Sequence, residues 1–100
     1  MKLLLRLAAV ADLRATRDYY EQAGSRLHEQ FAEELDRLFA RLEAFPRSAP
    51  VVAGYEPVRR APLRRFPYAV FYRFTEPDDR IDVLRIVHTT RSPDSWPTPH

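Results

Sequence analysis

The fold of this chain is decided by residues 68–88, which read YAVFYRFTEPDDRIDVLRIVH. Side chains alternate between the two faces of a strand, so a strand over residues 68–75 gathers one set of large apolar groups on a single face. That set is Tyr68, Val70, Tyr72 and Phe74. The acids and the proline of residues 76–79 favour a turn, and residues 81–88 return as a second apolar strand. This stretch therefore predicts an antiparallel β-hairpin.

Upstream of the hairpin, residues 25–45 carry the strongest helical pattern. Apolar side chains recur there at steps of three and four, which places them on one face of a helix. They are Leu27, Phe31, Leu35, Leu38, Leu42 and Phe45. Ser25 is a suitable cap for the start of this helix, and Pro46 ends it.

A shorter helix is predicted over residues 10–23. Its apolar side is made by Val10, Leu13 and Tyr20, with Ala9 and Tyr19 beside them, and Gly24 ends it. Because little more than Gly24 separates the two helices, we expect them to pack as an antiparallel hairpin.

Two further strands complete the predicted order. Residues 2–7 form a leucine-rich run of strand length, and residues 55–61 give a weaker strand whose neighbouring prolines favour an edge position. The order β-α-α-β-β-β predicts an α+β fold in which an N-terminal helical hairpin packs on a small, mostly antiparallel sheet. At 100 residues, the chain is expected to be one domain, 1–100. Three prolines in residues 93–100 argue against a closing helix.

Composition excludes several classes of protein. The chain has no cysteine, so it contains neither a disulfide framework nor a cysteine-based metal site. Arg6 interrupts the apolar N-terminus before a secretion signal reaches its usual length, and no window approaches a membrane span of about 20 apolar residues. We therefore expect a soluble, cytoplasmic protein. We also expect no metal or nucleotide cofactor, because the histidines and acids do not cluster at ligand spacing and the sequence has no glycine-rich phosphate loop.

Positive charge is concentrated in one segment. Residues 47–75 hold six arginines and a single acid, Glu56, although the net charge of the whole chain is only +2. Phosphates, an acidic protein segment or plain solvent are all suitable neighbours for such a segment. Phosphate contacts by Arg59, Arg60, Arg64 and Arg65, and salt bridges from them to acids on the helices, are equal alternatives.

His88 stands where the last predicted strand ends, with Arg91 close behind it. A histidine beside arginines is able to serve as a general acid in RNA cleavage, while the arginines stabilise the phosphate. The simpler alternative is that His88 bonds a loop carbonyl and Arg91 fastens the chain end. The base that cleavage also requires is not evident, since Tyr72 fits the inner face of a strand and Glu56 and Tyr68 have no convincing placement.

Several short patterns together resemble the RelE/ParE toxin superfamily over nearly the whole chain. They are Asp12-Leu13, Tyr19-Tyr20, the helix ending in Phe45-Pro46, Arg65-Phe66-Pro67-Tyr68-x3-Tyr72, and Val87-His88-x2-Arg91. The resemblance implies the toxin of a bacterial type II toxin-antitoxin module. It also implies a cognate antitoxin partner, which normally supplies the operator-binding fold.

Within that superfamily the residues favour the ParE-like branch, whose members inhibit DNA gyrase by contact. The mRNA interferase branch usually has an arginine directly after the tyrosine that begins the third strand, whereas this chain has Ala69 there. That branch also commonly ends in a catalytic tyrosine or a histidine-tyrosine pair, whereas this chain has Trp96 and a proline-rich tail. The predicted contacts with target or antitoxin are Arg59, Arg65, His88, Arg91 and Trp96. In the alternative, a ribosome-dependent mRNA interferase, Arg65 and Arg91 hold the scissile phosphate and His88 is the acid.

Overall fold

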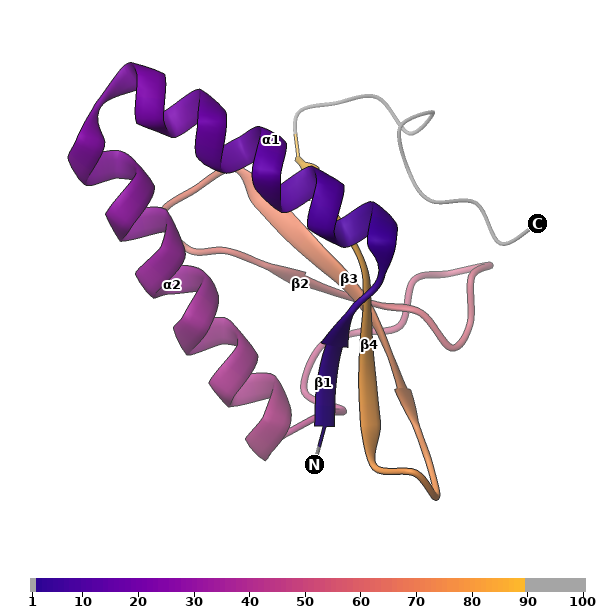
Figure 1. Cartoon of the computed structure of the whole chain (residues 1–100). Coiled ribbons are helices and arrows are strands. Elements are labelled where there is room, and N and C mark those ends of the chain that lie inside the picture. Colours follow the sequence, from indigo (N-terminus) through magenta and orange to yellow (C-terminus); the bar gives the residue numbers. More distant parts are fainter. Residues whose placement is uncertain (1, 90–100) are drawn as a thin grey trace.

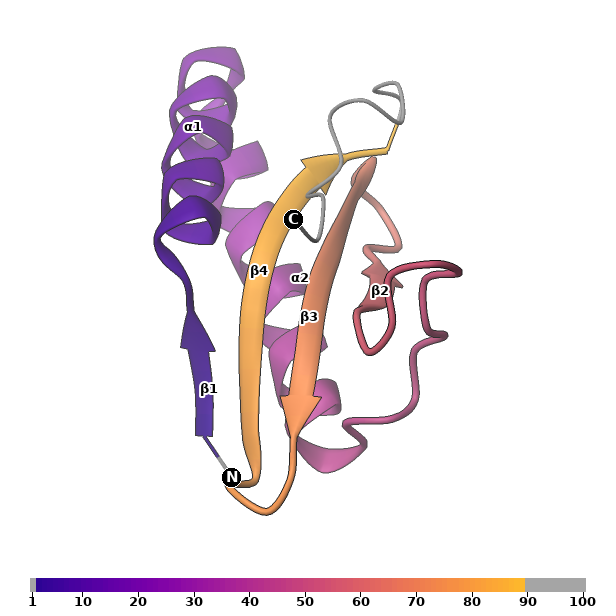
Figure 2. The same cartoon turned by 90° about the vertical axis from the view of Figure 1, so that its right-hand side faces the viewer.

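The computed structural model describes residues 2–89 and has the predicted order of elements. They are β1 (Lys2–Leu5), α1 (Leu7–Ala23), α2 (Ser25–Ala44), β2 (Arg59–Pro62), β3 (Tyr68–Thr75) and β4 (Arg80–His88). The strands lie in the order β1-β4-β3-β2, with β1 parallel to β4 and the other pairs antiparallel (Figure 2). Both helices cover one face of this sheet (Figure 1), so the predicted α+β architecture is confirmed.

Two element boundaries differ from the sequence prediction. The first strand ends at Leu5, because the N–H of Arg6 bonds the carbonyl of Val83 and the N–H of Val10 already makes a helical bond to Arg6. Strand β2 starts four residues later than expected. The N–H groups of Tyr55 and Val58 are used in successive turns, so they are not available to the sheet ladder. The edge position predicted for this strand is confirmed.

The main core lies between the helices and the sheet. From α2 it receives Phe31, Leu35, Leu38 and Leu42, all nearly inaccessible, as the helical pattern predicts. Both ends of the predicted stripe are wrong: Leu27 is 39% exposed and Phe45 is 65% exposed. Phe45 has left helical geometry, with φ −136° and ψ 75°, so the helical spacing no longer points its ring inward.

From α1 the core receives mainly Ala9 and Tyr20, which are buried as predicted. Tyr19, expected beside them, is instead 63% exposed, and Thr16 is buried in its place. The Thr16 hydroxyl donates a hydrogen bond of 2.9 Å to the backbone carbonyl of Asp12, which lets a polar side chain occupy the inner face of the helix.

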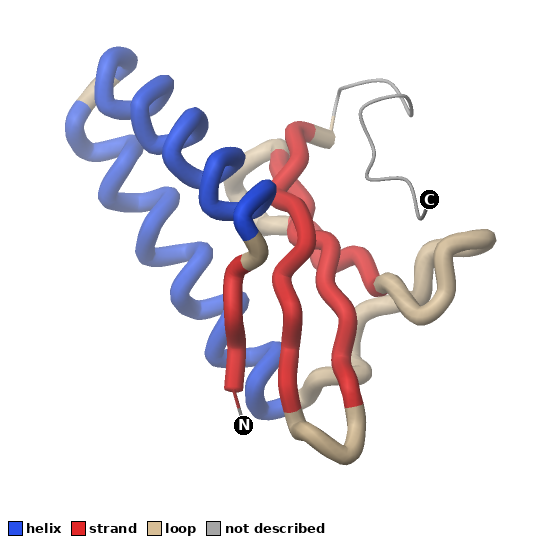
Figure 3. Tube along the Cα trace, turned by 45° about the vertical axis from the view of Figure 1, so that its right-hand side comes forward, coloured by secondary structure: helices blue, strands red, loops and turns tan. Residues whose placement is uncertain are grey.

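A second, smaller apolar cluster covers part of the opposite face of the sheet. Ala69, Phe71 and Val87 pack there with Val52 and Val58 from the long loop between α2 and β2. Figure 3 shows this loop crossing from the end of α2 to the far side of the strands. Strand β3 is therefore buried on both faces over its first half.

Asp82, near the start of β4, is a charged residue that is 0% exposed. It lies on the face away from the helices, where Arg73 is its partner across β3. Guanidinium nitrogens of Arg80, Arg6 and Arg73 lie 3.3, 3.5 and 3.9 Å from its carboxylate oxygens. Since burial of an unpaired carboxylate is costly, these three arginines are what makes the position tolerable.

Candidate functional site

The loop between β2 and β3 is the structural centre of the candidate site. Glu34 on α2, only 8% exposed, accepts hydrogen bonds from the backbone N–H of Arg64 at 2.5 Å and of Arg65 at 3.0 Å. The next residue, Phe66, packs edge-on against Tyr20 and Phe31, with ring centroids 5.2 and 5.4 Å apart. The backbone of the loop is thus fixed, while the side chains of Arg64 and Arg65 remain exposed.

Two clefts flank this loop. The first, which we call the arginine cleft, has a volume of about 430 Å³ and lies between α2 and the end of β2. Its lining residues are Glu34, Arg37, Leu38, Arg41, Pro62, Leu63, Arg64 and Arg65. Arginines stand on both walls, and apolar groups from Leu38, Pro62 and Leu63 contribute between them.

The second cleft, called the aromatic cleft, has a volume of about 530 Å³ and lies between α1 and the ends of β3 and β4. It is lined by Ala15, Thr16, Tyr19, Tyr20, Pro67, Tyr68 and His88. Tyr68 and His88 are opposite each other in the β3–β4 ladder, and their rings meet edge to face at 5.0 Å. Apolar faces with polar edges suit the binding of a partner side chain or a planar group.

Two buried tyrosines, Tyr20 and Tyr72, have a raised pKa. Burial raises the pKa of Tyr20, and the neighbouring Tyr68 and Tyr19 raise it further. Burial is also the main cause of the raised pKa of Tyr72, whose hydroxyl donates to the carbonyl of Pro46 at 2.8 Å. Neither phenol is therefore suited to act as a base near neutral pH.

The residues predicted to contact the target or the antitoxin lie in different parts of the structure. Arg65 lines the arginine cleft and His88 the aromatic cleft, and the two clefts lie beside the same loop. Arg59 fastens the loop before β2: its Nη1 donates to the carbonyls of Ala49 at 2.7 Å and Arg47 at 3.3 Å. Arg91 and Trp96 lie outside the described residues.

Of the candidate bases, Tyr72 is confirmed as an inner-face residue with 0% exposure. Glu56 is exposed, and among the described residues that line the two clefts neither Glu56 nor Tyr72 occurs. A contact between the arginine cluster and α2 exists at Glu34, but it is not the salt bridge that was one of the two alternatives. It is made by the backbone of Arg64 and Arg65 and not by their guanidinium groups.

Sequence reasoning missed Glu34 as the residue that positions the loop. Its spacing carries a usable signal, because it stands three residues after Phe31 and four before Leu38, on the buried side of α2. An acid on a buried helical face needs a hydrogen-bond donor from another element. What the spacing does not say is which element supplies that donor.

The described part of the chain contains neither a candidate metal site nor a membrane-spanning helix. Between residues 2 and 89, no group of three or more histidine, aspartate or glutamate side chains is placed to hold a metal ion. Neither of the two described helices is long and apolar enough to cross a membrane.

Comparison with known proteins gives a consistent family match. The family model for the ParE toxin of the type II toxin-antitoxin system, parDE, matches residues 3–93. No curated protein sequence matches the chain significantly.

Solved structures resemble the chain in fold. A chain of the chromosomal ParDE toxin-antitoxin system from P. aeruginosa is 24% identical with a TM-score of 0.73, over 88% of this chain and 95% of that one. The isolated E. coli RelE toxin is 20% identical with a TM-score of 0.64, over 93% and 88%. A chain of the intact E. coli RelBE toxin-antitoxin complex is 20% identical with a TM-score of 0.65, over 90% and 98%.

Proposed function

This chain belongs to the ParE toxin family of type II toxin-antitoxin systems, and from that membership we propose that it arrests growth by binding and inhibiting DNA gyrase. In this proposal the toxin acts by protein contact, without chemistry of its own. A cognate antitoxin holds it inactive by covering its apolar and basic surfaces.

The observation that carries the choice of target is the environment of Ala69. This residue takes the position at which the interferase branch of the superfamily usually has an arginine. It is 1% exposed, lies between Pro62 and Val87 in neighbouring strands, and packs in the apolar cluster with Phe71. No cation is therefore supplied to a phosphate from this position, which supports contact inhibition over RNA cleavage.

The separation of Arg65 and His88 adds to this support. An interferase would need both groups at one phosphate, but they line clefts on different sides of the loop at residues 63–67. Neutral Tyr20 and Tyr72 are unsuited to accept the proton of an attacking hydroxyl, as argued above.

Pairing with an antitoxin is supported by the exposed apolar groups of the described residues. Tyr19 and Phe45 are each more than half exposed, at 63% and 65%. Tyr19 also lines the aromatic cleft, where its ring offers an apolar surface to a side chain of the antitoxin. One of the similar solved structures is, by its description, a toxin-antitoxin complex.

The test is to induce the protein without antitoxin in a bacterial host. DNA-damage signalling and the supercoiling activity of purified gyrase are followed beside the integrity of bulk mRNA. Blocked supercoiling with intact mRNA is the expected result. Cuts at codon positions in translated mRNA, with normal supercoiling, would overturn the proposal and assign Arg65, His88 and Arg91 to catalysis.

A further inference from the structure

The arginine cleft carries more positive charge than its own acid neutralises. Four arginines line it against a single glutamate, Glu34. One carboxylate oxygen of Glu34 accepts both the Arg64 and the Arg65 N–H, and the other lies 3.3 Å from the Arg65 N–H. Glu34, the only acid among the described residues that line the cleft, is thus bonded to backbone donors, which leaves a cationic surface.

Among the described residues, one salt bridge from outside the cleft offsets part of this charge. Arg37 is paired with Glu33 at 3.7 Å, but both side chains are largely exposed, and such a pair contributes at most about 1 kcal/mol. The exposed side chains of Arg41 and Arg64 belong to opposite walls of the cleft, α2 and the loop after β2. Arginines on both walls of a cleft favour a ligand that brings carboxylate or phosphate oxygens between them.

The floor of the cleft favours a peptide over a nucleic acid. Leu38 and Leu63 are 4% and 8% exposed, and the more exposed Pro62 lies beside them. Among the described lining residues there is no aromatic ring, whereas single-stranded nucleic acids are usually held by stacking on such rings. Pro62, with the small exposed parts of Leu38 and Leu63, therefore forms a short apolar strip between the arginines, which matches one apolar side chain flanked by acids.

The neighbouring edge of the sheet limits how a peptide partner is able to bind. Strand β2 is at the edge of the sheet, but Pro62 has no N–H to donate. The N–H of Arg60 is already bonded to the carbonyl of Pro50 at 3.0 Å. Addition of a partner strand along this edge would therefore lack donors, and recognition must rest on side chains.

We propose that the arginine cleft is the docking site for an acidic segment of the antitoxin, in which carboxylates flank one apolar anchor residue. The inference rests on the proposed function only in taking the antitoxin as the partner. It adds that this contact is electrostatic and separate from the aromatic cleft that contains His88.

The experiment compares two double charge reversals in the full-length chain. Arg41→Glu/Arg64→Glu alters the two walls of the cleft, and the matched control Arg17→Glu/Arg26→Glu alters exposed arginines of α1 and α2 that do not line it. Affinity for the purified cognate antitoxin is measured by calorimetry at low and high salt. Thermal unfolding verifies that each variant folds, and Arg41→Gln/Arg64→Gln replaces the reversal if it does not.

The expected result is at least a tenfold loss of antitoxin affinity for the cleft variant, with a smaller salt dependence than the unaltered chain, and less than a threefold loss for the control. A cleft variant that binds as tightly as the control would overturn the proposal. So would displacement of the antitoxin by duplex DNA but not by a synthetic peptide of alternating glutamate and leucine.

The outcome is independent of the toxin's target. Gyrase supercoiling assays on the same variants without antitoxin report on the proposed function alone. Loss of antitoxin affinity with no effect of the unaltered chain on gyrase would sustain the cleft assignment while refuting gyrase as the target. Full inhibition of gyrase by the unaltered chain, together with an antitoxin affinity that the cleft substitutions leave unchanged, would support gyrase as the target and refute the cleft assignment.

Discussion

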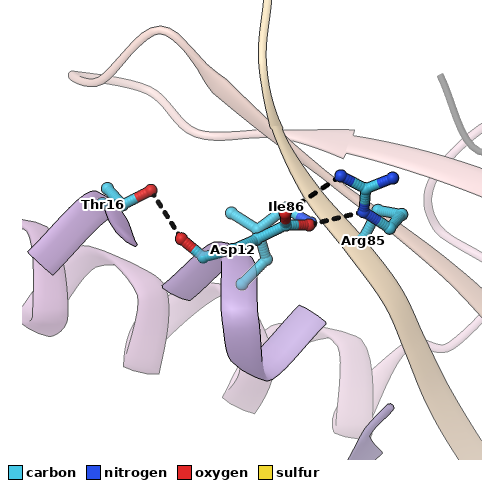
Figure 4. Close-up of polar contacts among 4 residues, drawn as sticks. All are labelled: Asp12, Thr16, Arg85 and Ile86. Atoms are coloured by element: carbon cyan, nitrogen blue, oxygen red, sulfur yellow. Dashed lines mark hydrogen bonds and ion pairs between the residues drawn. The ribbon is translucent and has the colours of Figure 1, made fainter. Parts of the chain in front are cut away.

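Asp12 of α1 and Arg85 of β4, 73 positions apart, form a two-pronged ion pair with N–O distances of 2.7 and 3.0 Å (Figure 4). The same carboxylate accepts the backbone N–H of Ile86 at 2.9 Å. Strand β1 ends opposite Val83, so within residues 2–89 the rest of β4 has no strand on that side. Asp12 replaces one of the missing ladder bonds and attaches α1 to the sheet. These hydrogen bonds raise the pKa of Arg85, outweighing the effect of its partial burial.

Asp12→Ala is expected to lower the free energy of unfolding by about 2–3 kcal/mol, because the substitution leaves the Ile86 N–H without an acceptor and Arg85 without its partner. Asp12→Asn keeps one acceptor and should cost about 1 kcal/mol. Urea denaturation measures both values, and exchange of the Ile86 amide should accelerate in the alanine variant. Asp18→Ala, at an exposed position of the same helix, is the control. Equal effects at positions 12 and 18 would contradict this role.

Asp82→Asn is expected to destabilise the chain by about 1–3 kcal/mol, since Arg6, Arg73 and Arg80 then repel one another without a central carboxylate. The guanidinium groups are partly exposed, so added salt should screen this repulsion and reduce the deficit. Urea denaturation at two salt concentrations tests the expectation. Asp78→Asn removes an exposed acid of the turn and changes the net charge equally. If the loss of stability in Asp82→Asn does not change with salt concentration, repulsion among the arginines is ruled out as its cause.

Alkaline pH should unfold this protein through its buried tyrosines. The pKa values of Tyr20 and Tyr72 are raised above the ordinary value of 10.0, so the folded state retains protons that the unfolded state loses. Stability is therefore unaffected by these groups below about pH 10 and falls as the pH rises above it. Tyr20→Phe and Tyr72→Phe should each flatten this decline, because each removes one of the two groups with a raised pKa. Denaturation curves from pH 8 to pH 11 give the comparison.

Contact inhibition and RNA cleavage predict different effects of substituting His88 on the activity of the protein. For a contact inhibitor, His88→Gln should change inhibition of gyrase by less than about threefold, while Arg65→Ala and Trp96→Ala should each weaken it about 5- to 30-fold. The measurement is the dose of purified protein that halves supercoiling. For an interferase, His88→Gln would instead lower the cleavage rate by a factor of about 100 or more, with binding preserved. That second pattern would exclude the contact mechanism.

Local sequence determined the elements of this protein. Alternation over residues 68–75 and the three- and four-residue steps of α2 specify strand and helix because each periodicity places its apolar groups on one face. Phe31, Leu35, Leu38 and Leu42 were predictable as core for that reason. The edge position of β2 followed from prolines that cannot donate to a ladder.

Tertiary structure alone decided which residues those elements bring together. Leu27, Phe45 and Tyr19 fit the apolar patterns of their helices but are exposed among the described residues. Periodicity does not show where the opposite element ends. The sequence could not reveal that Glu34 would hold the backbone of Arg64 and Arg65, or that Asp12 would meet Arg85. Nor could it show that one loop would separate Arg65 from His88. Periodicity reports the orientation of a side chain within its own element, whereas hydrogen bonds and clefts depend on which distant element lies opposite.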